Sequence, residues 1–140
     1  MADAYAGNIK PKDAWAMLAN EPKAVLVDVR TLAEWSYVGV PDLSSLGKEP
    51  LFNSWVVFPT MERNPNFIAE VQQAVADPQA PILFLCRSGV RSRAAAIAMT
   101  ERGYSRCYTI QYGFEGDMDA SRHRNSVAGW RADRLPWTQS

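Results

Sequence analysis

The sequence has 140 residues, of which 47% are hydrophobic, and its 15 basic and 15 acidic side chains give a formal net charge of zero. This size and apolar content predict one domain, residues 1–140 with a core from about residue 9 to 137, that needs no metal or disulfide to hold its core. The balanced charge gives no reason to expect nucleic-acid or membrane partners, and no apolar run approaches membrane-spanning length.

The amino terminus and the cysteines indicate a cytoplasmic protein. The start Met1–Tyr5 lacks the basic and apolar segments of a signal peptide. Two cysteines, Cys86 and Cys107, are too few for a disulfide framework, and we expect both to be free thiols. The sequence has no His/Cys cluster with metal-ligand spacing, so we expect no metal and no other cofactor.

The first elements alternate between strand and helix patterns. Ile9–Asp13 reads as a strand end followed by a helix start, and Asn20–Pro22 stops that helix. The helix carries an apolar stripe at helical spacing: Ala14, Trp15 and Leu18. The run Ala24–Asp28 is rich in aliphatic residues and predicts a parallel strand that is buried on both faces and ends in a carboxylate.

A short helix should follow this strand. Thr31 can cap it, and Glu34 stands three residues later, which is the spacing of a capping box. Arg30 and Glu34 are four residues apart, a spacing at which an ion pair is expected on a helix. A cap with an ordinary ion pair and a role in shaping a functional site are both compatible with this pattern.

The middle of the chain is less regular. Gly39–Pro50 is rich in glycine, proline and serine and predicts an irregular surface connection, followed by a strand at Leu51–Phe58 and a loop at Pro59–Pro65. Apolar residues at helical intervals predict a helix over Phe67–Ala76. Some side chains of this region could form an apolar wall beside a site, although such residues more often fill the core: Trp55, Phe58 and Met61.

The stretch Pro81–Ile110 predicts one strand-helix-strand crossover. An apolar strand ends on Cys86, a helix follows over Val90–Arg102 with Gly103 as its carboxyl-terminal cap, and a further strand covers Arg106–Ile110. Such a unit is expected to be right-handed, and its helix, apolar on nearly all sides, should be buried against the sheet.

Cys86 is the candidate reactive residue. Unpaired amides at the start of the next helix should point toward its thiol, at the bottom of a cup, and Arg87, Arg91 and Arg93 crowd the same loop. A helix amino terminus contributes up to ~2 kcal/mol to an anion, and an arginine at about 4 Å up to ~4 kcal/mol at a surface-like dielectric. Both favour a thiolate. The alternative is an inert structural cysteine, as expected for Cys107 within its strand.

The last part of the chain should complete the body. Gly113–Gly116 predicts a turn, and the tail carries Trp130 and Trp137, which we expect to dock it. The single histidine, His123, lies in a polar tract and is expected at the surface, so a Cys–His catalytic pair is not indicated.

The loop Cys86–Ser92 resembles that of the rhodanese family, the single-domain sulfurtransferases. Three further segments support the resemblance: Asp28–Arg30 with Glu34–Trp35 and Gly39, the turn at Gly113, and Leu135–Trp137. The sequence departs from the family at Val40–Leu43 and the insertion after it, and at Tyr112–Gly113, where a double glycine is usual. These departures concern the entrance to the site and therefore the acceptor.

The resemblance implies an α/β fold with a central, mostly parallel five-stranded sheet and helices on both faces. It implies that Cys86 takes the outer sulfur of a small anionic donor such as thiosulfate, releases sulfite, and passes the sulfur from a persulfide to cyanide, a thiol or a protein acceptor. The implied substrate-binding residues are Arg87, Ser88, Gly89, Val90 and Arg91, whose amides would stabilise the persulfide and whose two arginines would orient the donor. The implied supporting residues are Asp28, Arg30, Glu34 and Ser92.

Two other functions remain open at this stage. Cysteine-dependent phosphatases and arsenate reductases also hold an anion beside a cysteine, but they place five residues between cysteine and arginine, whereas four separate Cys86 from Arg91. A non-catalytic rhodanese-like binding module is the other alternative, and loss of the cysteine would mark it. A protein-to-protein sulfur relay is a variant of the main hypothesis.

Overall fold

The structure is a computed structural model, and it describes residues 4–57, 60, 62–125 and 128–139. Its helices are α1 (Pro11–Asn20), α2 (Leu32–Tyr37), α3 (Phe67–Ala74) and α4 (Val90–Thr100), with a 3-10 turn η1 (Ser44–Leu46). The strands of the central sheet are β1 (Gly7–Ile9), β2 (Val25–Asp28), β4 (Leu51–Phe52), β7 (Ile82–Leu85) and β8 (Cys107–Ile110). Two small pairs complete the set: β3 (Val40–Pro41) with β9 (Trp137–Thr138), and β5 (Val56–Val57) with β6 (Glu62–Arg63).

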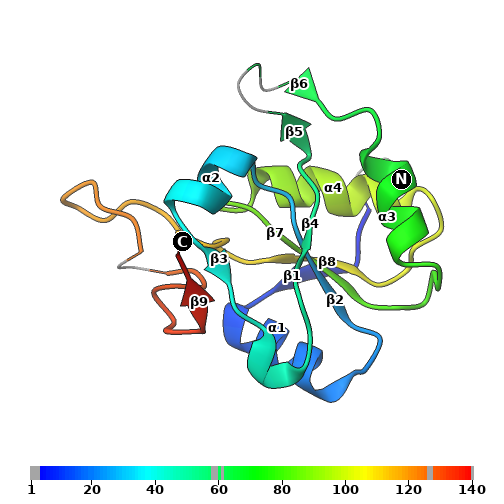
Figure 1. Cartoon of the computed structure of the whole chain (residues 1–140), viewed down its shortest axis with the longest axis horizontal. Coiled ribbons are helices and arrows are strands. Elements are labelled where there is room, and N and C mark those ends of the chain that lie inside the picture. Colours follow the sequence, from blue (N-terminus) through cyan, green and yellow to red (C-terminus); the bar gives the residue numbers. More distant parts are fainter. Residues whose placement is uncertain (1–3, 58–59, 61, 126–127, 140) are drawn as a thin grey trace.

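The central sheet has the strand order β1-β8-β7-β2-β4, and every pairing in it is parallel (Figure 1). The predicted α/β class with a five-stranded sheet is therefore confirmed. The strand-helix-strand unit β7–α4–β8 is also confirmed, because β7 and β8 are neighbours at the centre of the sheet. Since all five strands run the same way, their carboxyl ends meet at one edge, where ligands bind in such sheets.

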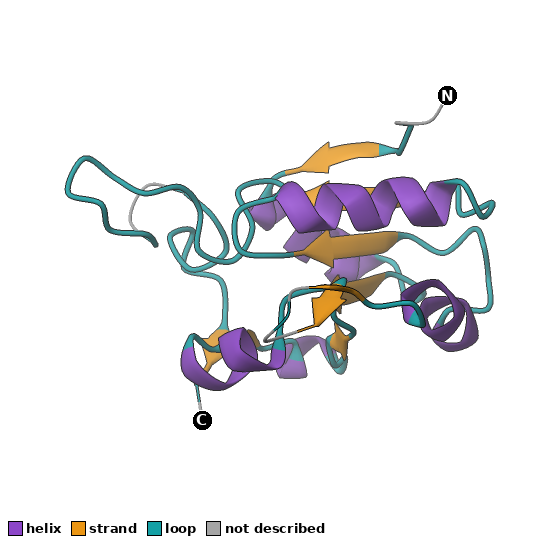
Figure 2. Cartoon of the chain, turned by 90° about the horizontal axis from the view of Figure 1, so that it is seen from above, coloured by secondary structure: helices purple, strands orange, loops and turns teal. Residues whose placement is uncertain are grey.

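Alternating side chains of the strands build a core on each face of the sheet. Along β7 and the residue after it, Ile82, Phe84 and Cys86 join the cluster under α3 and α4, whereas Leu83 and Leu85 join the cluster under α1. Figure 2 shows α4 lying along one face of the strands. Helices thus cover both faces, as predicted, and Cys86 belongs to the α4 side.

The region after α2 differs from the prediction. The expected irregular connection contains β3 and η1, and the expected strand Leu51–Phe58 is divided into β4 and β5. The division arises because the backbone amides of Asn53 and Trp55 donate to the carbonyls of Asp28 and Val29, which draws the chain across the end of β2. The expected loop at 59–65 contains β6, which pairs with β5.

The predicted apolar wall is only partly described, because Phe58 and Met61 lie outside the described residues. Trp55 packs edge-to-face on Phe67 of α3, with ring centroids 5.1 Å apart, so it belongs to the core under α3. Helix α3 ends at Ala74 and α4 at Thr100, two residues earlier than predicted in each case, and β8 begins at Cys107.

The carboxyl-terminal tail docks on the body through Trp130, as predicted. Its side chain is fully buried, packs against Trp15 at 6.0 Å between centroids, and donates its indole N–H to the carbonyl of Pro136. Trp137 is partly exposed and pairs with Pro41 between β9 and β3.

His123 is exposed, as predicted. Among the described residues, no helix is long and apolar enough to cross a membrane.

Candidate active site

Cys86 follows β7 directly, at the carboxyl-terminal edge of the sheet and beside the start of α4. The backbone amide of Gly89 donates to its Sγ at 3.1 Å, and Sγ lies 3.4 Å from the hydroxyl of Ser92. Gly89 is the N-cap of α4 and adopts φ +128°, a conformation that side-chain-bearing residues rarely adopt. The helix thus presents its amino-terminal end to the sulfur, where its unpaired amides favour negative charge.

The thiol is more enclosed than the open cup expected from the sequence. The exposed fraction of Cys86 is 1%. The reason is local: the loop after Cys86 turns back so that Gly89 and Ser92 both contact the sulfur, and Ser92 is itself fully buried. The resemblance implied that the amides of residues 87–91 surround the sulfur. Among the described residues, the amide of Gly89 is the one of these that is hydrogen-bonded to Sγ.

The start of the loop is fixed by the segment that follows β8. The amide of Phe114 donates to the Cys86 carbonyl at 2.8 Å, and the amides of Glu115 and Gly116 donate to the Arg87 carbonyl at 3.0 and 3.2 Å. Gly113 allows this close approach, because a Cβ there would lie 2.5 Å from the Cys86 carbonyl oxygen. Both carbonyls are therefore paired with backbone amides of residues 114–116, which fixes the course of the loop.

Arg91 forms a two-point ion pair with Glu34 of α2. The distances are 2.7 Å from Nη1 to Oε1 and 2.9 Å from Nη2 to Oε2. Burial alone would raise the pKa of Glu34, but the hydrogen bonds and charge of Arg91, with the Thr31 amide, hold that pKa below its ordinary value. Burial alone would lower the pKa of Arg91, and Glu34 raises it instead, so both groups stay charged. The predicted capping box of Thr31 and Glu34 is confirmed.

Arg30 does not pair with Glu34 as its spacing suggested. It binds Asp28 instead, with 2.7 Å between Nη2 and Oδ2, and both side chains are fully buried. The reason is that Arg30 precedes Thr31, the N-cap, and so lies outside the helix, where its backbone N–H and its side chain both donate to the carboxylate of Asp28 two residues earlier. Arg30 also donates to the Gly39 carbonyl and stacks 4.2 Å above the Phe114 ring.

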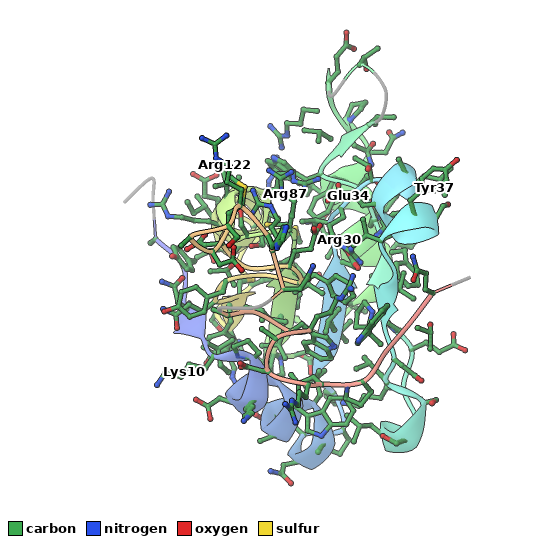
Figure 3. The ribbon with its side chains drawn as sticks, turned by 90° about the vertical axis from the view of Figure 1, so that its left-hand side faces the viewer. Lys10, Arg30, Glu34, Tyr37, Arg87 and Arg122 are labelled. Atoms are coloured by element: carbon green, nitrogen blue, oxygen red, sulfur yellow. The ribbon has the colours of Figure 1, made fainter. Side chains whose placement is uncertain are left out.

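The remaining loop residues lie around two cavities. Arg87 is exposed and lines a cavity of about 360 Å³ together with Glu34, Val38, Arg91 and Glu115. Figure 3 labels Arg87, Glu34 and Arg30, which lie near one another in that view. Ser88 and Arg93 line a second cavity of about 290 Å³, on the β1 side of the loop. The Val90 side chain is 80% exposed, at the first position of α4.

Thr109 is a site residue that the sequence did not indicate. It lies on β8 next to β7, is 4% exposed, and its hydroxyl is hydrogen-bonded to the hydroxyl of Ser92. The packing of α4 against β8 brings these two residues together. Cys107 lies on the same strand, is fully buried, and burial raises its pKa to about 11. The described residues contain no cluster of metal-ligating side chains.

The chain is similar in sequence to one family model and to several known proteins. The family model described as the STR4 middle domain matches residues 6–140. An uncharacterized protein of Rickettsia rickettsii, the RP600 homolog, is 42% identical over 130 residues, which cover 93% of this chain and 95% of that protein. The thiosulfate sulfurtransferase GlpE of Actinobacillus pleuropneumoniae is 31% identical over 108 residues, which cover 77% of this chain and 82% of that protein.

A solved structure is similar over its whole length. The crystal structure of Rv0390 from M. tuberculosis has a TM-score of 0.89 and 50% identity to this chain, and the match covers 98% of this chain and 100% of that one. The sheet order, the helices on both faces and these likenesses together show a rhodanese-like fold.

Proposed function

Because the chain belongs to the STR4 middle-domain family and has a rhodanese-like fold, we propose that it is a sulfurtransferase that carries sulfur as a persulfide on Cys86. The observation that carries the proposal is the hydrogen bond from the Gly89 amide to Sγ at the amino terminus of α4. A peptide N–H and a helix dipole aimed at one sulfur favour the anionic forms of that sulfur, the thiolate and the persulfide. GlpE, named as a thiosulfate sulfurtransferase, suggests the donor.

In the proposed reaction the thiolate of Cys86 attacks the outer sulfur of thiosulfate. A sulfur–sulfur bond forms at Sγ, the bond between the outer sulfur and the sulfonate breaks, and sulfite leaves with the electron pair. A nucleophilic acceptor, cyanide or a thiolate, then takes the terminal sulfur and Cys86 departs as the thiolate. No cofactor is needed, because sulfur itself is the electrophile.

The two arginines of the loop have different tasks under this proposal. Arg87 is exposed and makes no ion pair within the described residues, so its guanidinium is available for the donor's sulfonate. Arg91 is already bound at two points by Glu34. It contributes a fixed positive charge near Cys86, and Glu34 competes with the donor for its N–H groups.

The enclosure of Cys86 favours a second candidate function, a non-catalytic rhodanese-like module. A donor reaches a thiol that is 1% exposed only if the loop side chains move aside, whereas a binding module needs no such access. Phosphatase or arsenate chemistry fits less well: the short spacing of Cys86 to Arg91 remains, and both terminal nitrogens of Arg91 are engaged by Glu34 rather than free to surround an oxyanion.

Intact-mass analysis after mixing with thiosulfate separates these functions. We expect a gain of one sulfur atom in the native protein and in Cys107→Ala, no gain in Cys86→Ser, and loss of the added sulfur when cyanide is supplied. Cys107 provides the matched control because it is the other cysteine of the chain. A folded protein that gains no sulfur contradicts the proposal and supports the binding module. Turnover of a phenyl phosphate in place of thiosulfate would support the phosphatase.

A further inference from the structure

We propose that Thr109 is a positioning residue that acts through Ser92 to stabilise the anionic forms of Cys86. The inference rests on the proposed function for its catalytic meaning, because a persulfide carrier needs a stable thiolate. It does not rest on that function for its structural basis, which is a chain of three buried polar groups: Cys86, Ser92 and Thr109.

The hydroxyl of Ser92 has one proton and several neighbours. It lies 3.4 Å from Sγ and 3.2 Å from the carbonyl oxygen of Gly89, and it is also hydrogen-bonded to the hydroxyl of Thr109. A serine hydroxyl donates one hydrogen bond and accepts two. When Cys86 is a thiol, its S–H donates to Ser92 and the Ser92 proton is directed to the Gly89 carbonyl.

The thiolate requires the opposite arrangement. Sγ then has no proton to donate, so the Ser92 hydroxyl must turn its single proton from the Gly89 carbonyl toward Sγ. That proton is available only if Ser92 is not donating it to Thr109. Thr109 must therefore donate its own proton to the Ser92 oxygen, which also strengthens Ser92 as a donor, since hydrogen bonds in a chain polarise one another.

Burial makes this arrangement matter energetically. Ser92 is fully buried and Thr109 is 4% exposed, so water does not easily replace a missing partner. Thr109 lines the cavity of about 290 Å³ beside Gly89, on the β1 side of the loop and apart from the cavity that Arg87 and Arg91 line. Its side chain thus lines a different cavity from the one beside Arg87, the arginine proposed to bind the donor's sulfonate.

The charged and titratable groups around Cys86 do not replace the hydrogen bonds that link Cys86, Ser92 and Thr109. None of them forms a hydrogen bond through its side chain with Ser92 or Thr109 in the described residues. They come from every neighbouring element: Arg87 and Arg91 from the loop and α4, Glu34 from α2, the ion pair of Asp28 at the end of β2 with Arg30 after it, Glu115 after β8, and Arg93 with Tyr5 on the β1 side. Their charges are unchanged by substitutions at Thr109.

The test is the pH dependence of iodoacetamide alkylation of Cys86, measured in a Cys107→Ala background without any sulfur donor. Thr109→Val keeps the shape of the side chain and removes the hydroxyl. We expect its midpoint to move to higher pH and its alkylation rate near pH 7 to fall about threefold to tenfold, the value of one buried hydrogen bond. Thr109→Ser keeps the hydroxyl and should restore the native profile.

Two further variants separate positioning from packing. If Thr109 acts through Ser92, Ser92→Ala combined with Thr109→Val should be no slower than Ser92→Ala alone. Thr100→Val is the matched control, because Thr100 lies at the far end of α4 and bonds the Ala96 carbonyl, and its profile should be native. Thr109→Ala replaces the valine variant if thermal unfolding shows that valine is not accommodated.

Several results would overturn the proposal. These are a native midpoint in a folded Thr109→Val or Thr109→Ala protein, a serine variant as impaired as the valine variant, an additive double variant, or an equal shift in Thr100→Val. The readout needs no sulfur transfer. A Thr109-dependent alkylation profile in a protein that gains no sulfur from thiosulfate therefore contradicts the proposed function alone.

Discussion

Arg91 and Glu34 join the two helices that flank the cysteine loop. The pair connects α4 to α2 across 57 positions of sequence through two hydrogen bonds of 2.7 and 2.9 Å, and both side chains are less than one-fifth exposed. Glu34 also accepts a hydrogen bond from the Thr31 amide in the capping box. One carboxylate therefore both caps α2 and neutralises an arginine beside Cys86.

Glu34→Gln should strengthen binding of an anionic donor while weakening the fold. The amide keeps an acceptor for the Thr31 N–H, but it no longer neutralises Arg91, so the charge around the loop rises by one. We expect the KM for thiosulfate to fall about threefold at low salt, with the effect shrinking as salt is added. The free energy of unfolding should fall by about 1 kcal/mol.

Steady-state kinetics at two salt concentrations and urea denaturation check this. Glu21→Gln is the matched control, because Glu21 forms the same kind of two-point pair with Arg106 at the amino-terminal end of the strands. It makes the same charge change away from the loop and should leave the KM native. A KM in Glu34→Gln that is unchanged or higher would contradict the role given to Glu34.

The same pair should give the fold an acid-sensitive contribution. The pKa of Glu34 is lower in the folded protein than its ordinary value of 4.5, so its ionised form stabilises the fold above that pH. This stabilisation is lost as the pH falls through the lowered folded value, where both states bind the proton. The stability difference between native protein and Glu34→Gln should thus be constant from about pH 6 to 8 and shrink below about pH 4.5. A constant difference down to about pH 3 would show that the ionised form contributes nothing.

Much of the fold could be predicted from the sequence because its signals are local. The buried strands that end at Asp28 and just before Cys86 are nearly continuous apolar runs, and the Thr31–Glu34 cap depends on four neighbouring residues. The strand before Cys86 and the helix after it together identify the loop around its thiol. Periodicity and capping patterns act within a few residues, so one sequence is enough to find them.

The partners of the charged residues could not be predicted in the same way. Spacing suggested that Arg30 pairs with Glu34, but that rule holds within a helix, and Arg30 precedes α2. Glu34 instead takes an arginine 57 positions away. Thr109 reaches Ser92 because α4 packs against β8 in the folded protein. Contacts of this kind depend on the strand order, which no local pattern contains.

Replacing Arg91 tests whether its charge or its shape is needed. Arg91→Ala removes the positive charge and leaves Glu34 without its partner, so we expect the KM for thiosulfate to rise about tenfold. Arg91→Lys keeps the charge but cannot bind Glu34 at two points, so an intermediate KM is expected. Steady-state kinetics with Arg106→Ala as the control distinguishes these effects from loss of an ion pair in general. A native KM in Arg91→Ala would remove this residue from the site.

The two cysteines should differ in reactivity in the folded protein. Burial raises the pKa of Cys107 to about 11, and its thiol lies 3.6 Å from the Tyr104 carbonyl on the α4 side of the core. A thiol with so high a pKa stays protonated at neutral pH, and the thiolate is the reactive form. Mass spectrometry after iodoacetamide treatment near pH 8 should find one label, on Cys86, in the native protein and none in Cys86→Ser. Both cysteines should react in denaturant. A label on Cys107 in the folded protein would contradict this assignment.

Gly113→Ala should disturb the cysteine loop although residue 113 does not touch the sulfur. Gly113 has φ +63°, and a Cβ there would lie 2.5 Å from the Cys86 carbonyl oxygen and 2.6 Å from that of Arg87. Both neighbours are backbone atoms, so they cannot rotate away as a side chain would. The carbonyls must move, which breaks the hydrogen bonds from Phe114 and Glu115 and displaces the loop that holds Sγ.

We expect Gly113→Ala to lose at least about 2 kcal/mol of unfolding free energy and most of its sulfur transfer. Gly47→Ala is the matched control, because Gly47 has a similar φ of +69° but open space around its Cβ position. The control should show only the cost of the backbone conformation, about 1 kcal/mol, and native transfer. Urea denaturation and the intact-mass assay measure both quantities. Equal losses in the two variants would mean that the contact between residue 113 and the loop carbonyls is not what sets the position of Cys86.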